Sequence, residues 1–310
     1  MSKTIFSIIF SFNRAMQLDA TLRSFYLHCQ DSESITLFVI YRTTTKQHFR
    51  QYNQLITEYK NFDIKFIKET NFRNNIMNLL IERAYGKSNS WSNFFTKLVS
   101  TFPIFFILPP PKKQQFLLFL VDDCIFVRKF SLLQKIDDLK NQSTALGYSL
   151  RLGTNTSYCY TLQSLQRIPN FTSISEETNL FCWKKADLDF AYPLEVSSSI
   201  YRFKDLYPFI LKFTFNNPNS LESKISCHAK HFAKTKPNLL CSNLSIAFSN
   251  PINKIQEVFP NRVGSSSKYS INNLAELFDK GQRININSFA GYIPKSCHEE
   301  IELEFLKNEM

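Results

Sequence analysis

The sequence contains few glycines and no long apolar run. Of its 310 residues, 6 are glycine, 31 are phenylalanine and 20% are charged, which argues against a fibrous or disordered chain and indicates a globular protein. No stretch reaches the roughly 18 consecutive apolar residues that a membrane-spanning helix needs. No small-residue cleavage site follows the apolar N-terminal stretch, residues 4–12, so a strand is a better interpretation than a signal peptide. We therefore expect a cytoplasmic protein.

The sequence also lacks the short motifs of several enzyme classes. It contains no GxxxxGK[ST], no GxGxxG, no HExxH and no GxSxG, so the corresponding chemistries are poorly supported. Its seven cysteines are irregularly spaced and form no CxxC pair, which favours free thiols in a reducing compartment. One group, Cys227, His228, His231 and Cys241, leaves a zinc site open as the minor alternative to a helix with surface histidines.

The chain is basic, with a net charge of +11 and a pI near 9.2. Such a charge favours attraction to phosphate groups on nucleotides, nucleic acid or anionic lipid. The lysines and arginines are scattered in ones and twos and form no basic helical stripe, so a solvated basic surface is the main interpretation. Because no nucleic-acid-binding motif is present, we expect no nucleic-acid partner.

Strand and helix patterns alternate three times near the N-terminus. Apolar strand patterns at Ile5 to Phe12, Ile35 to Tyr41 and Ile64 to Ile67 are each followed by a helix pattern. This alternation predicts βαβ units on a parallel sheet that helices cover on both faces. In open sheets of this kind, ligands bind at the carboxyl ends of the strands.

The alternation stops between residues 86 and 113. We interpret this segment as an insertion that packs near the active-site mouth or on a membrane surface. A helix at about Phe130 to Lys140 follows, and after it come short strand patterns between polar loops. Since we find no clear linker and no internal repeat, we expect residues 1–310 to form a single domain with two halves, 1–128 and 129–310.

Two adjacent aspartates, Asp122 and Asp123, follow the apolar run Phe116 to Val121. A continuous apolar run predicts a central, buried strand, which places both acids at its carboxyl end. Burying an unpaired carboxylate is costly, so folding alone would not favour acids at this position. Carboxylate oxygens are suitable ligands for Mg²⁺ or Mn²⁺, and the metal in turn binds a diphosphate. A helix cap or a surface turn is the structural alternative.

Several stretches, in this order and spacing, resemble a known family. FSIIFSFNRAMQLDATLRSF, ITLFVIYRTTT and FLLFLVDDCIFV resemble the nucleotide-binding half of GT-A-fold glycosyltransferases. GYSLRLGTNTSYCY, FCWKKADLDFAYPLEVSSSIYR and SCHEEIELEF are similar to a group of bacterial family-2-like glycosyltransferases, so the resemblance covers most of the chain. It implies an α/β fold of the GT-A (Rossmann-like) type, with a mostly parallel sheet flanked by helices. Residues 1–128 would then be the nucleotide-binding half and 129–310 an elaborated acceptor-side half.

The resemblance also implies a donor site. Asp122 and Asp123 would hold Mn²⁺ or Mg²⁺ on the diphosphate of a nucleotide-sugar donor, and His298 would complete the metal shell. Arg151 would neutralise phosphate, although a solvated or ion-paired arginine is an equal alternative. The residues that would face the nucleotide are Ser11, Asn13, Arg14, Tyr41, Arg42 and Asp122.

An inverting transferase also needs a carboxylate that deprotonates the acceptor hydroxyl. The candidates are Glu195, Asp189 and Asp187. The family pattern carries an aspartate and then a glycine where this chain has Ser197 and Ser198. This departure leaves the identity of the base open.

The function that the resemblance implies is metal-dependent transfer of a sugar from a nucleoside diphosphate donor. The acceptor would be a glycan, lipid or protein hydroxyl, the stereochemistry inverting, and the location cytoplasmic or at the inner membrane face. Two alternatives stay open. One is a degenerate GT-A domain that binds nucleotide without turnover, and the other is a basic phosphate- or nucleic-acid-binding protein in which the two aspartates are structural.

Overall fold

The computed structural model describes residues 3–86, 111, 114–253, 264 and 267–307. The insertion expected at residues 86–113 lies outside them, except for Gly86 and Pro111. The strands are β1 (Ile5–Phe12), β2 (Ile35–Arg42), β3 (Ile64–Lys68), β4 (Phe116–Val121), β5 (Cys124–Phe126), β6 (Ala145–Ser149), β7 (Tyr158–Cys159), β8 (Ser164–Leu165), β9 (Thr172–Ser173), β10 (Thr178–Cys182), β11 (Ser199–Arg202), β12 (Asn238–Ser242), β13 (Ala247–Ser249), β14 (Gln282–Ile284) and β15 (Phe305–Lys307). The helices are α1 (Ala15–His28), α2 (Lys46–Glu58), α3 (Phe72–Tyr85), α5 (Leu132–Asn141), α6 (Phe203–Lys212), α7 (Pro218–Ser226), α8 (Ala229–Phe232) and α9 (Ile271–Asp279).

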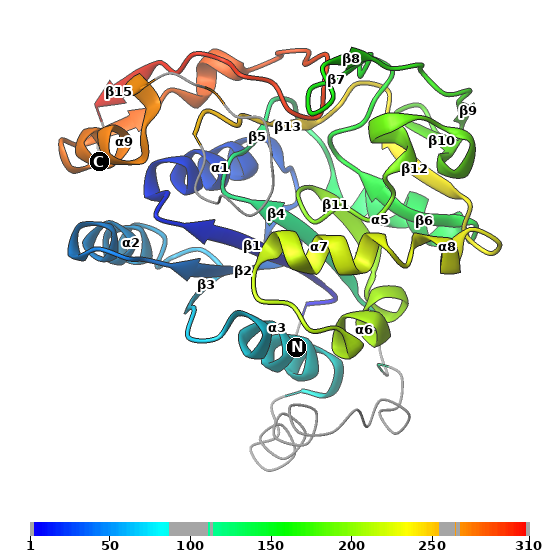
Figure 1. Cartoon of the computed structure of the whole chain (residues 1–310), viewed down its shortest axis with the longest axis horizontal. Coiled ribbons are helices and arrows are strands. Elements are labelled where there is room, and N and C mark those ends of the chain that lie inside the picture. Colours follow the sequence, from blue (N-terminus) through cyan, green and yellow to red (C-terminus); the bar gives the residue numbers. More distant parts are fainter. Residues whose placement is uncertain (1–2, 87–110, 112–113, 254–263, 265–266, 308–310) are drawn as a thin grey trace.

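Within the described ranges, the main sheet has nine strands in the order β3-β2-β1-β4-β11-β6-β12-β10-β9 (Figure 1). Strands β3, β2, β1 and β4 are parallel neighbours, and β12 is parallel to β6. Strand β11 runs antiparallel to both β4 and β6, and β10 runs antiparallel to both β12 and β9. All strands of the sheet except β10 and β11 therefore run in one direction. The expected α/β class with a mostly parallel sheet flanked by helices is confirmed.

Strands β2, β1 and β4 are interior neighbours in the sheet, and the prediction that Phe116 to Val121 forms a central, buried strand is confirmed. Ile5 pairs with Ile35 on one side and with Phe116 on the other, and all three residues are buried. Successive side chains of a strand point to opposite faces of a sheet. Ile9 therefore lies in one core and Phe10 in the other. Because both faces of each strand are buried, apolar residues occupy successive positions and produce the continuous runs seen in the sequence.

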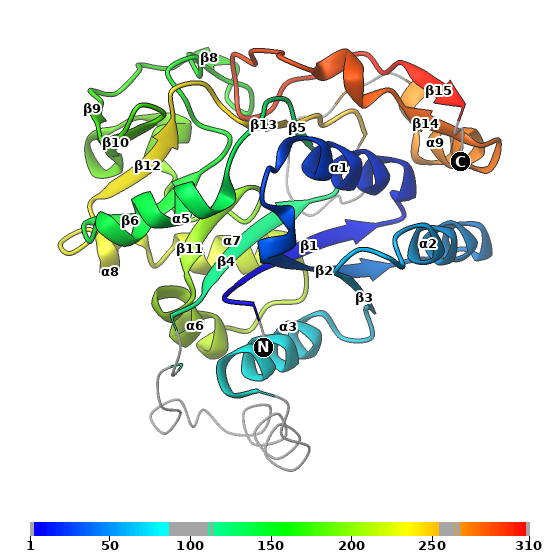
Figure 2. The same cartoon turned by 180° about the vertical axis from the view of Figure 1, so that it is seen from behind.

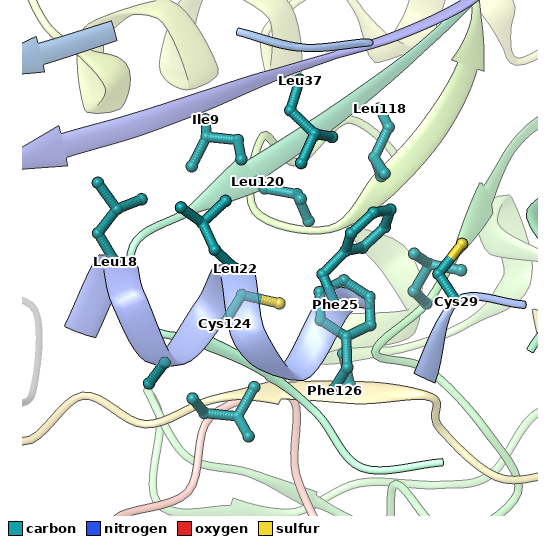
Figure 3. Packing of buried hydrophobic residues seen from close by; sticks show 14 of the residues in the cluster. Ile9, Leu18, Leu22, Phe25, Cys29, Leu37, Leu118, Leu120, Cys124 and Phe126 are labelled. Atoms are coloured by element: carbon teal, nitrogen blue, oxygen red, sulfur yellow. The ribbon is translucent and has the colours of Figure 1, made fainter. Parts of the chain in front are cut away.

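Helix α1 covers one face of the sheet, with α2, α5 and α9 contributing to the same core. Its residues Leu18, Leu22 and Phe25 follow i, i+4, i+7 spacing, which aligns them on one side of the helix. Figure 3 shows them facing the strands. The labelled strand residues opposite them are Ile9, Leu37, Leu118 and Leu120. The amphipathic pattern after β1 is therefore explained by burial against β1, β2 and β4.

Helices α3, α6 and α7 contribute to the core on the opposite face. Figures 1 and 2 show α3 and α6 across the sheet from α1. The ring of Phe6 on β1 makes edge-to-face contacts with Phe38 and Phe203, at centroid distances of 6.4 and 5.3 Å. Because helices cover both faces of this part of the sheet, the strand ends are the natural place for a ligand.

The C-terminal segment returns to the N-terminal half. Ser270 caps the start of helix α9, since its Oγ accepts a hydrogen bond from the amide of Asn273. After the helix the chain turns at Gly281, which has a φ of 76°. A serine side chain and a glycine turn therefore bound this helix. Gln51 on α2 donates a 2.8 Å hydrogen bond to the carbonyl of Ala275 and so joins the two segments. Within the described ranges, the helices are too short or too polar to cross a bilayer.

Candidate active site

A cavity of about 740 Å³ lies at the carboxyl ends of β1, β2 and β4. The end of β1 contributes residues 10–12, the end of β2 contributes Ile40 and Arg42, and the end of β4 contributes residues 121–123. The predicted site residues that line it are Ser11, Arg14, Arg42, Asp122, Asp123, Arg151, Asp189, Glu195 and His298. The structure thus brings together residues from both halves of the chain.

Two residues expected to face the nucleotide, Asn13 and Tyr41, do not line this cavity. Asn13 has a φ of 55°, and its side chain exchanges hydrogen bonds of 2.7 and 3.0 Å with the side chain and amide of Thr44. Tyr41 is 5% exposed and stacks on Tyr52 at a centroid distance of 4.7 Å. Both residues fix the backbone at the ends of β1 and β2, and their direct contact with a nucleotide stays a prediction.

Asp122 is held by contacts to both carboxylate oxygens. Its Oδ2 accepts hydrogen bonds from Ser11 Oγ at 2.9 Å and from the amide of Phe12 at 3.2 Å. Its Oδ1 accepts from Nη1 of Arg14 at 3.1 Å. Burial raises the pKa of Asp122, and the neighbouring Asp123 raises it further, while Arg14 acts in the opposite direction. The end of β4 is therefore tied to the end of β1 through a buried acid.

Asp123 shares the same cation. Its Oδ2 also lies 3.1 Å from Nη1 of Arg14, so one guanidinium nitrogen bridges both aspartates. Nη2 of Arg14 donates to the carbonyl of Asn253. Burial by itself would lower the pKa of Arg14, but the two aspartates raise it above its ordinary value. The guanidinium stays charged and balances one of the two carboxylates.

A tyrosine that sequence reasoning did not select supports this arrangement. The hydroxyl of Tyr52 on α2 accepts from the amide of Arg14 at 3.2 Å and is hydrogen-bonded to Ser11 Oγ. Because Ser11 donates its proton to Asp122, the Tyr52 hydroxyl donates to Ser11. In the sequence, Tyr52 is one of several apolar residues at helical spacing, and nothing there shows where its hydroxyl points.

Arg151 and Glu195 form a second buried ion pair. They are 5% and 7% exposed, and Nη2 of Arg151 lies 3.1 Å from Oε2 of Glu195. The loop after Glu195 wraps around this carboxylate. The amide of Ser198 donates to it at 3.1 Å, and the amide of Ser197 and the hydroxyl of Ser199 donate to it as well. The SSS stretch that departs from the family pattern therefore binds a buried carboxylate.

His298 reaches the cavity from the C-terminal segment. It forms an isolated bridge with Ser249, which ends β13, and the next residue, Asn250, donates its amide to the carbonyl of Asp123 at 2.9 Å. Nε2 of His298 lies 3.1 Å from Nη1 of Arg151. Burial and the charge of Arg151 lower the pKa of His298 to about 3, so the ring is neutral at physiological pH.

The carboxylate of Asp189 has fewer hydrogen-bond partners than that of Glu195. Oδ1 of Asp189 accepts a 3.4 Å hydrogen bond from Cys159 Sγ, and its Oδ2 is buried without a hydrogen-bond partner among the described residues. Burial raises the pKa of Asp189. The preceding residue, Leu188, has a φ of 51°, a left-handed conformation that a leucine rarely adopts. Local backbone strain therefore accompanies this acid at the cavity wall.

Glu222 on α7 is a further acid of the cavity that the sequence did not indicate. It accepts hydrogen bonds from the amide of Val196 at 2.9 Å and from the hydroxyl of Tyr192 at 3.1 Å. Burial raises its pKa, and the nearby Glu195 adds to the rise. In the sequence it is one ordinary charge on a short polar helix, and only the fold shows that it faces the cavity.

The acids suit a divalent cation only in part. Within the described ranges, no three His, Cys, Asp or Glu side chains lie close enough to hold a metal ion. The predicted shell of Asp122, Asp123 and His298 is therefore not assembled, and it stays a prediction. Oxygens of the two aspartates do converge on a common point, each 3.1 Å from Nη1 of Arg14. This pair fits a hard cation once the guanidinium has moved away.

One curated protein is similar to the chain over most of its length. Over 308 aligned residues the chain is 27% identical to the bifunctional glycosyltransferase pgtA of Dictyostelium discoideum, and the match covers 90% of this chain and 36% of that protein. This chain resembles a glycosyltransferase. The resemblance found in the sequence motifs is thus confirmed, although the chain spans only about a third of the relative's length. No protein-family model matches the chain.

Two solved glycosyltransferase structures show a weaker similarity. Staphylococcus aureus TarS, residues 1–349 in complex with UDP, is 13% identical with a TM-score of 0.44, covering 79% of this chain and 58% of that chain. The mannosyltransferase PcManGT of Pyrobaculum calidifontis, in complex with GDP-Man and Mn²⁺, is 9% identical with a TM-score of 0.30, covering 51% and 41%. Both scores are below 0.5, so the chemistry of this site must be argued from its own residues.

Proposed function

We propose that this chain is a glycosyltransferase of the GT-A type that moves a sugar from a nucleoside diphosphate donor to a hydroxyl group. The observation that carries the proposal is the pair Asp122 and Asp123 at the end of β4, inside a cavity of about 740 Å³ at the carboxyl ends of parallel strands. Such a crevice is where open α/β sheets bind nucleotides. The curated relative supports the same activity. The acceptor we propose is a hydroxyl of a glycan, a lipid or a protein.

We further propose that donor binding depends on Mn²⁺ or Mg²⁺. The described cavity wall carries more acids than bases: its carboxylates are Glu69, Asp122, Asp123, Asp189, Glu195 and Glu222, and its guanidinium groups are Arg14, Arg42 and Arg151. This wall would repel a free diphosphate, and a divalent cation on the aspartates would reverse that repulsion. When bound, the cation would also stabilise the nucleoside diphosphate as it leaves. Ser11 and Arg42 are the proposed nucleotide contacts in the first half of the chain.

Asp189 is the catalytic base that the structure supports best. Of the other two candidates, Glu195 is paired with Arg151 and surrounded by the donors of the serine loop. Asp187 is an exposed acid that pairs with Arg167 and does not line the cavity. We propose that Asp189 Oδ2 takes the proton of the acceptor hydroxyl while the acceptor oxygen attacks the anomeric carbon. The bond from that carbon to the diphosphate oxygen breaks, and the electron pair leaves with the nucleotide. A single displacement of this kind inverts the anomeric centre.

Two alternatives from the sequence can be weighed against the structure. One alternative is a degenerate domain that binds nucleotide without turnover. It is favoured by Glu195, whose carboxylate is fully occupied by Arg151 and the serine loop, and it becomes the better interpretation if replacing Asp189 leaves sugar transfer unchanged. A basic phosphate- or nucleic-acid-binding protein is not favoured, because acids outnumber bases in the described cavity wall. The seven free cysteines support the proposed cytoplasmic location, and contact with the inner membrane face stays a prediction.

A thermal-shift panel tests the proposal. UDP, GDP, CDP and dTDP are added in turn, with and without Mn²⁺. A ligand at 100 times its dissociation constant stabilises a protein by about 2.7 kcal/mol, which is easily detected. We expect at least one nucleotide to stabilise the protein only when Mn²⁺ is present, and the matching nucleotide sugars then to release nucleoside diphosphate in the presence of acceptor. No shift with any nucleotide, with or without Mn²⁺, would refute nucleotide binding, and a shift without turnover would select the degenerate domain.

A further inference from the structure

We infer that Arg14 is a built-in counter-ion of the aspartate pair, which a divalent cation must displace, and that the released guanidinium then serves the donor's diphosphate. The inference rests on the proposed function and deepens it. Nη1 of Arg14 lies 3.1 Å from Oδ1 of Asp122 and 3.1 Å from Oδ2 of Asp123. These are the oxygens that a shared metal ion would need. A guanidinium and a divalent cation cannot both lie there, because their charges repel strongly at this distance.

The charges of the group favour such an exchange. One guanidinium faces two carboxylates, so the trio keeps one uncompensated negative charge in a largely buried place. The side chains of Arg14, Asp122 and Asp123 are 11%, 6% and 16% exposed. A divalent cation would neutralise both carboxylates. Without either cation, the two adjacent acids would repel each other, so Arg14 stabilises the protein in its ligand-free form.

The contacts of Arg14 allow its side chain to move independently of its backbone. The amide of Arg14 donates to Tyr52, and its carbonyl accepts from the amide of Leu18 at 2.9 Å, so the backbone is held by the start of α1. The guanidinium has other partners, namely the two aspartates and the carbonyl of Asn253. Its Nε is buried without a hydrogen-bond partner among the described residues. A rotation of the side chain therefore leaves the backbone contacts intact.

The released guanidinium is well suited to meet the diphosphate. Arg151 is held by Glu195, Ser249 and His298, so it has little freedom to turn. Arg42 has a side chain that is 58% exposed and lies 4.0 Å from Glu69. Arg14 is the cavity arginine that metal binding itself would set free. Metal binding and phosphate binding would then be coupled through one side chain.

The test measures Mn²⁺ binding by electron paramagnetic resonance of the free ion, first without nucleotide. We expect Arg14→Gln to bind Mn²⁺ at least tenfold more tightly than the unmodified protein, because the competing cation is gone. Arg14→Lys, which keeps a cation, should stay close to the unmodified protein. The matched control is Arg167→Gln, which removes an exposed arginine that does not line the cavity and should change the affinity by no more than about twofold.

A second titration adds UDP, GDP, CDP or dTDP at saturating Mn²⁺. Here Arg14→Gln should bind the preferred nucleotide several-fold more weakly. The variant should thus have a higher affinity for Mn²⁺ in the first titration and a lower affinity for the nucleotide in the second. Equal or weaker Mn²⁺ binding by Arg14→Gln, with normal Mn²⁺-dependent nucleotide binding by the unmodified protein, would overturn the inference and leave the proposed function intact. A different result would refute the metal-dependent function itself. In that case neither the unmodified protein nor any variant would bind Mn²⁺, whichever nucleotide is present.

Discussion

Nη1 of Arg151 donates a 3.1 Å hydrogen bond to Nε2 of His298, across 147 positions of the sequence. Arginine has no acceptor, so Nε2 must accept and the ring proton must lie on Nδ1. The nitrogen that faces Arg151 is therefore occupied, and the lowered pKa of His298 keeps the ring neutral. Arg151 in turn pairs with Glu195, so these three residues link the C-terminal segment to the loop after β10.

This link sets the expected effect of removing the histidine. His298→Ala should weaken Mn²⁺-dependent nucleotide binding by less than about tenfold, because Nε2 of His298 is bonded to Arg151 and Nδ1 carries the ring proton, so the ring acts by holding Arg151 and has no free nitrogen for a metal ion. Isothermal titration of nucleotide at fixed Mn²⁺ measures the change. His231→Ala on α8, which removes an exposed histidine, is the matched control and should have no effect. Complete loss of binding in His298→Ala would instead make the histidine essential.

Glu195→Gln should lower the free energy of unfolding by about 3 kcal/mol, because it leaves the buried charge of Arg151 without its counter-ion. Urea denaturation measures the loss, and Glu176→Gln, at an exposed acid, is the control with an expected change below about 0.5 kcal/mol. A Glu195→Gln variant that is fully stable but has lost sugar transfer would contradict the structural role. That result would favour Glu195 as the catalytic base.

The first half of the fold could be predicted because its strands are buried on both faces. Burial on both faces produces the continuous apolar runs of β1, β2 and β4, and the helices between them show 3.6-residue spacing. Strand β11 could not be placed in this way. It has four residues, and its position between β4 and β6 depends on pairing Ile200 with Leu118 and Tyr148, far away in the sequence.

The candidate site could be predicted as a set of residues but not as a set of contacts. A strand end locates Asp122 and Asp123, and a family motif points to His298. Which cation faces which acid depends on long-range packing: Arg14 reaches the aspartates, whereas Arg151 reaches Glu195. Polar groups carried on ordinary helix faces, such as Tyr52 and Glu222, give no local signal, because only tertiary structure directs them into the cavity.

Asp123→Asn should abolish Mn²⁺-dependent nucleotide binding and leave the fold intact. The variant removes one metal ligand, and it also removes the negative charge that Arg14 leaves uncompensated. The free energy of unfolding should therefore stay within about 1 kcal/mol of the unmodified protein or rise slightly. Thermal unfolding with and without UDP or GDP and Mn²⁺ measures both quantities, with Asp137→Asn on the exposed side of α5 as the control. Unfolding with unchanged nucleotide affinity would make the pair a structural cap.

Asp31 should contribute to stability in acid. Its carboxylate accepts hydrogen bonds from Ser131 Oγ at 2.6 Å and from the amides of Leu132 and Leu133 at 2.8 and 3.0 Å, so it caps the start of α5. Burial by itself would raise the pKa of Asp31, but these bonds together lower it below the ordinary value. The stabilisation is therefore fully present above the unfolded-state pKa of about 4 and is lost as pH falls through the lower folded-state pKa.

Asp31→Asn should consequently cost about 1 kcal/mol at neutral pH and flatten the acid side of the stability profile. Urea midpoints between pH 7 and low pH test this, and Glu33→Gln, at an exposed acid two positions after Asp31, should leave the profile unchanged. An Asp31→Asn profile that is as steep in acid as that of the unmodified protein would show that other groups control acid unfolding.

Asp189→Asn should lower the rate of sugar transfer by about 10²- to 10⁴-fold, the usual contribution of a general base. Nucleotide binding should be unchanged, because Asp189 makes no contact with the aspartate pair or with Arg14 among the hydrogen bonds of the described residues. Asp187→Asn, two positions earlier at an exposed acid that pairs with Arg167, is the matched control and should keep full activity.

The pH profile separates this role from a structural one. Burial raises the pKa of Asp189, and a base acts only when it is deprotonated, so kcat/KM should fall with decreasing pH at a value above the ordinary pKa of an aspartate. The residual activity of Asp189→Asn should lack this acidic limb, since no carboxylate remains to titrate. If the limb persists unchanged in Asp189→Asn, another group takes the proton from the acceptor, and Glu222, a further acid of the cavity whose pKa burial raises, becomes the next residue to test.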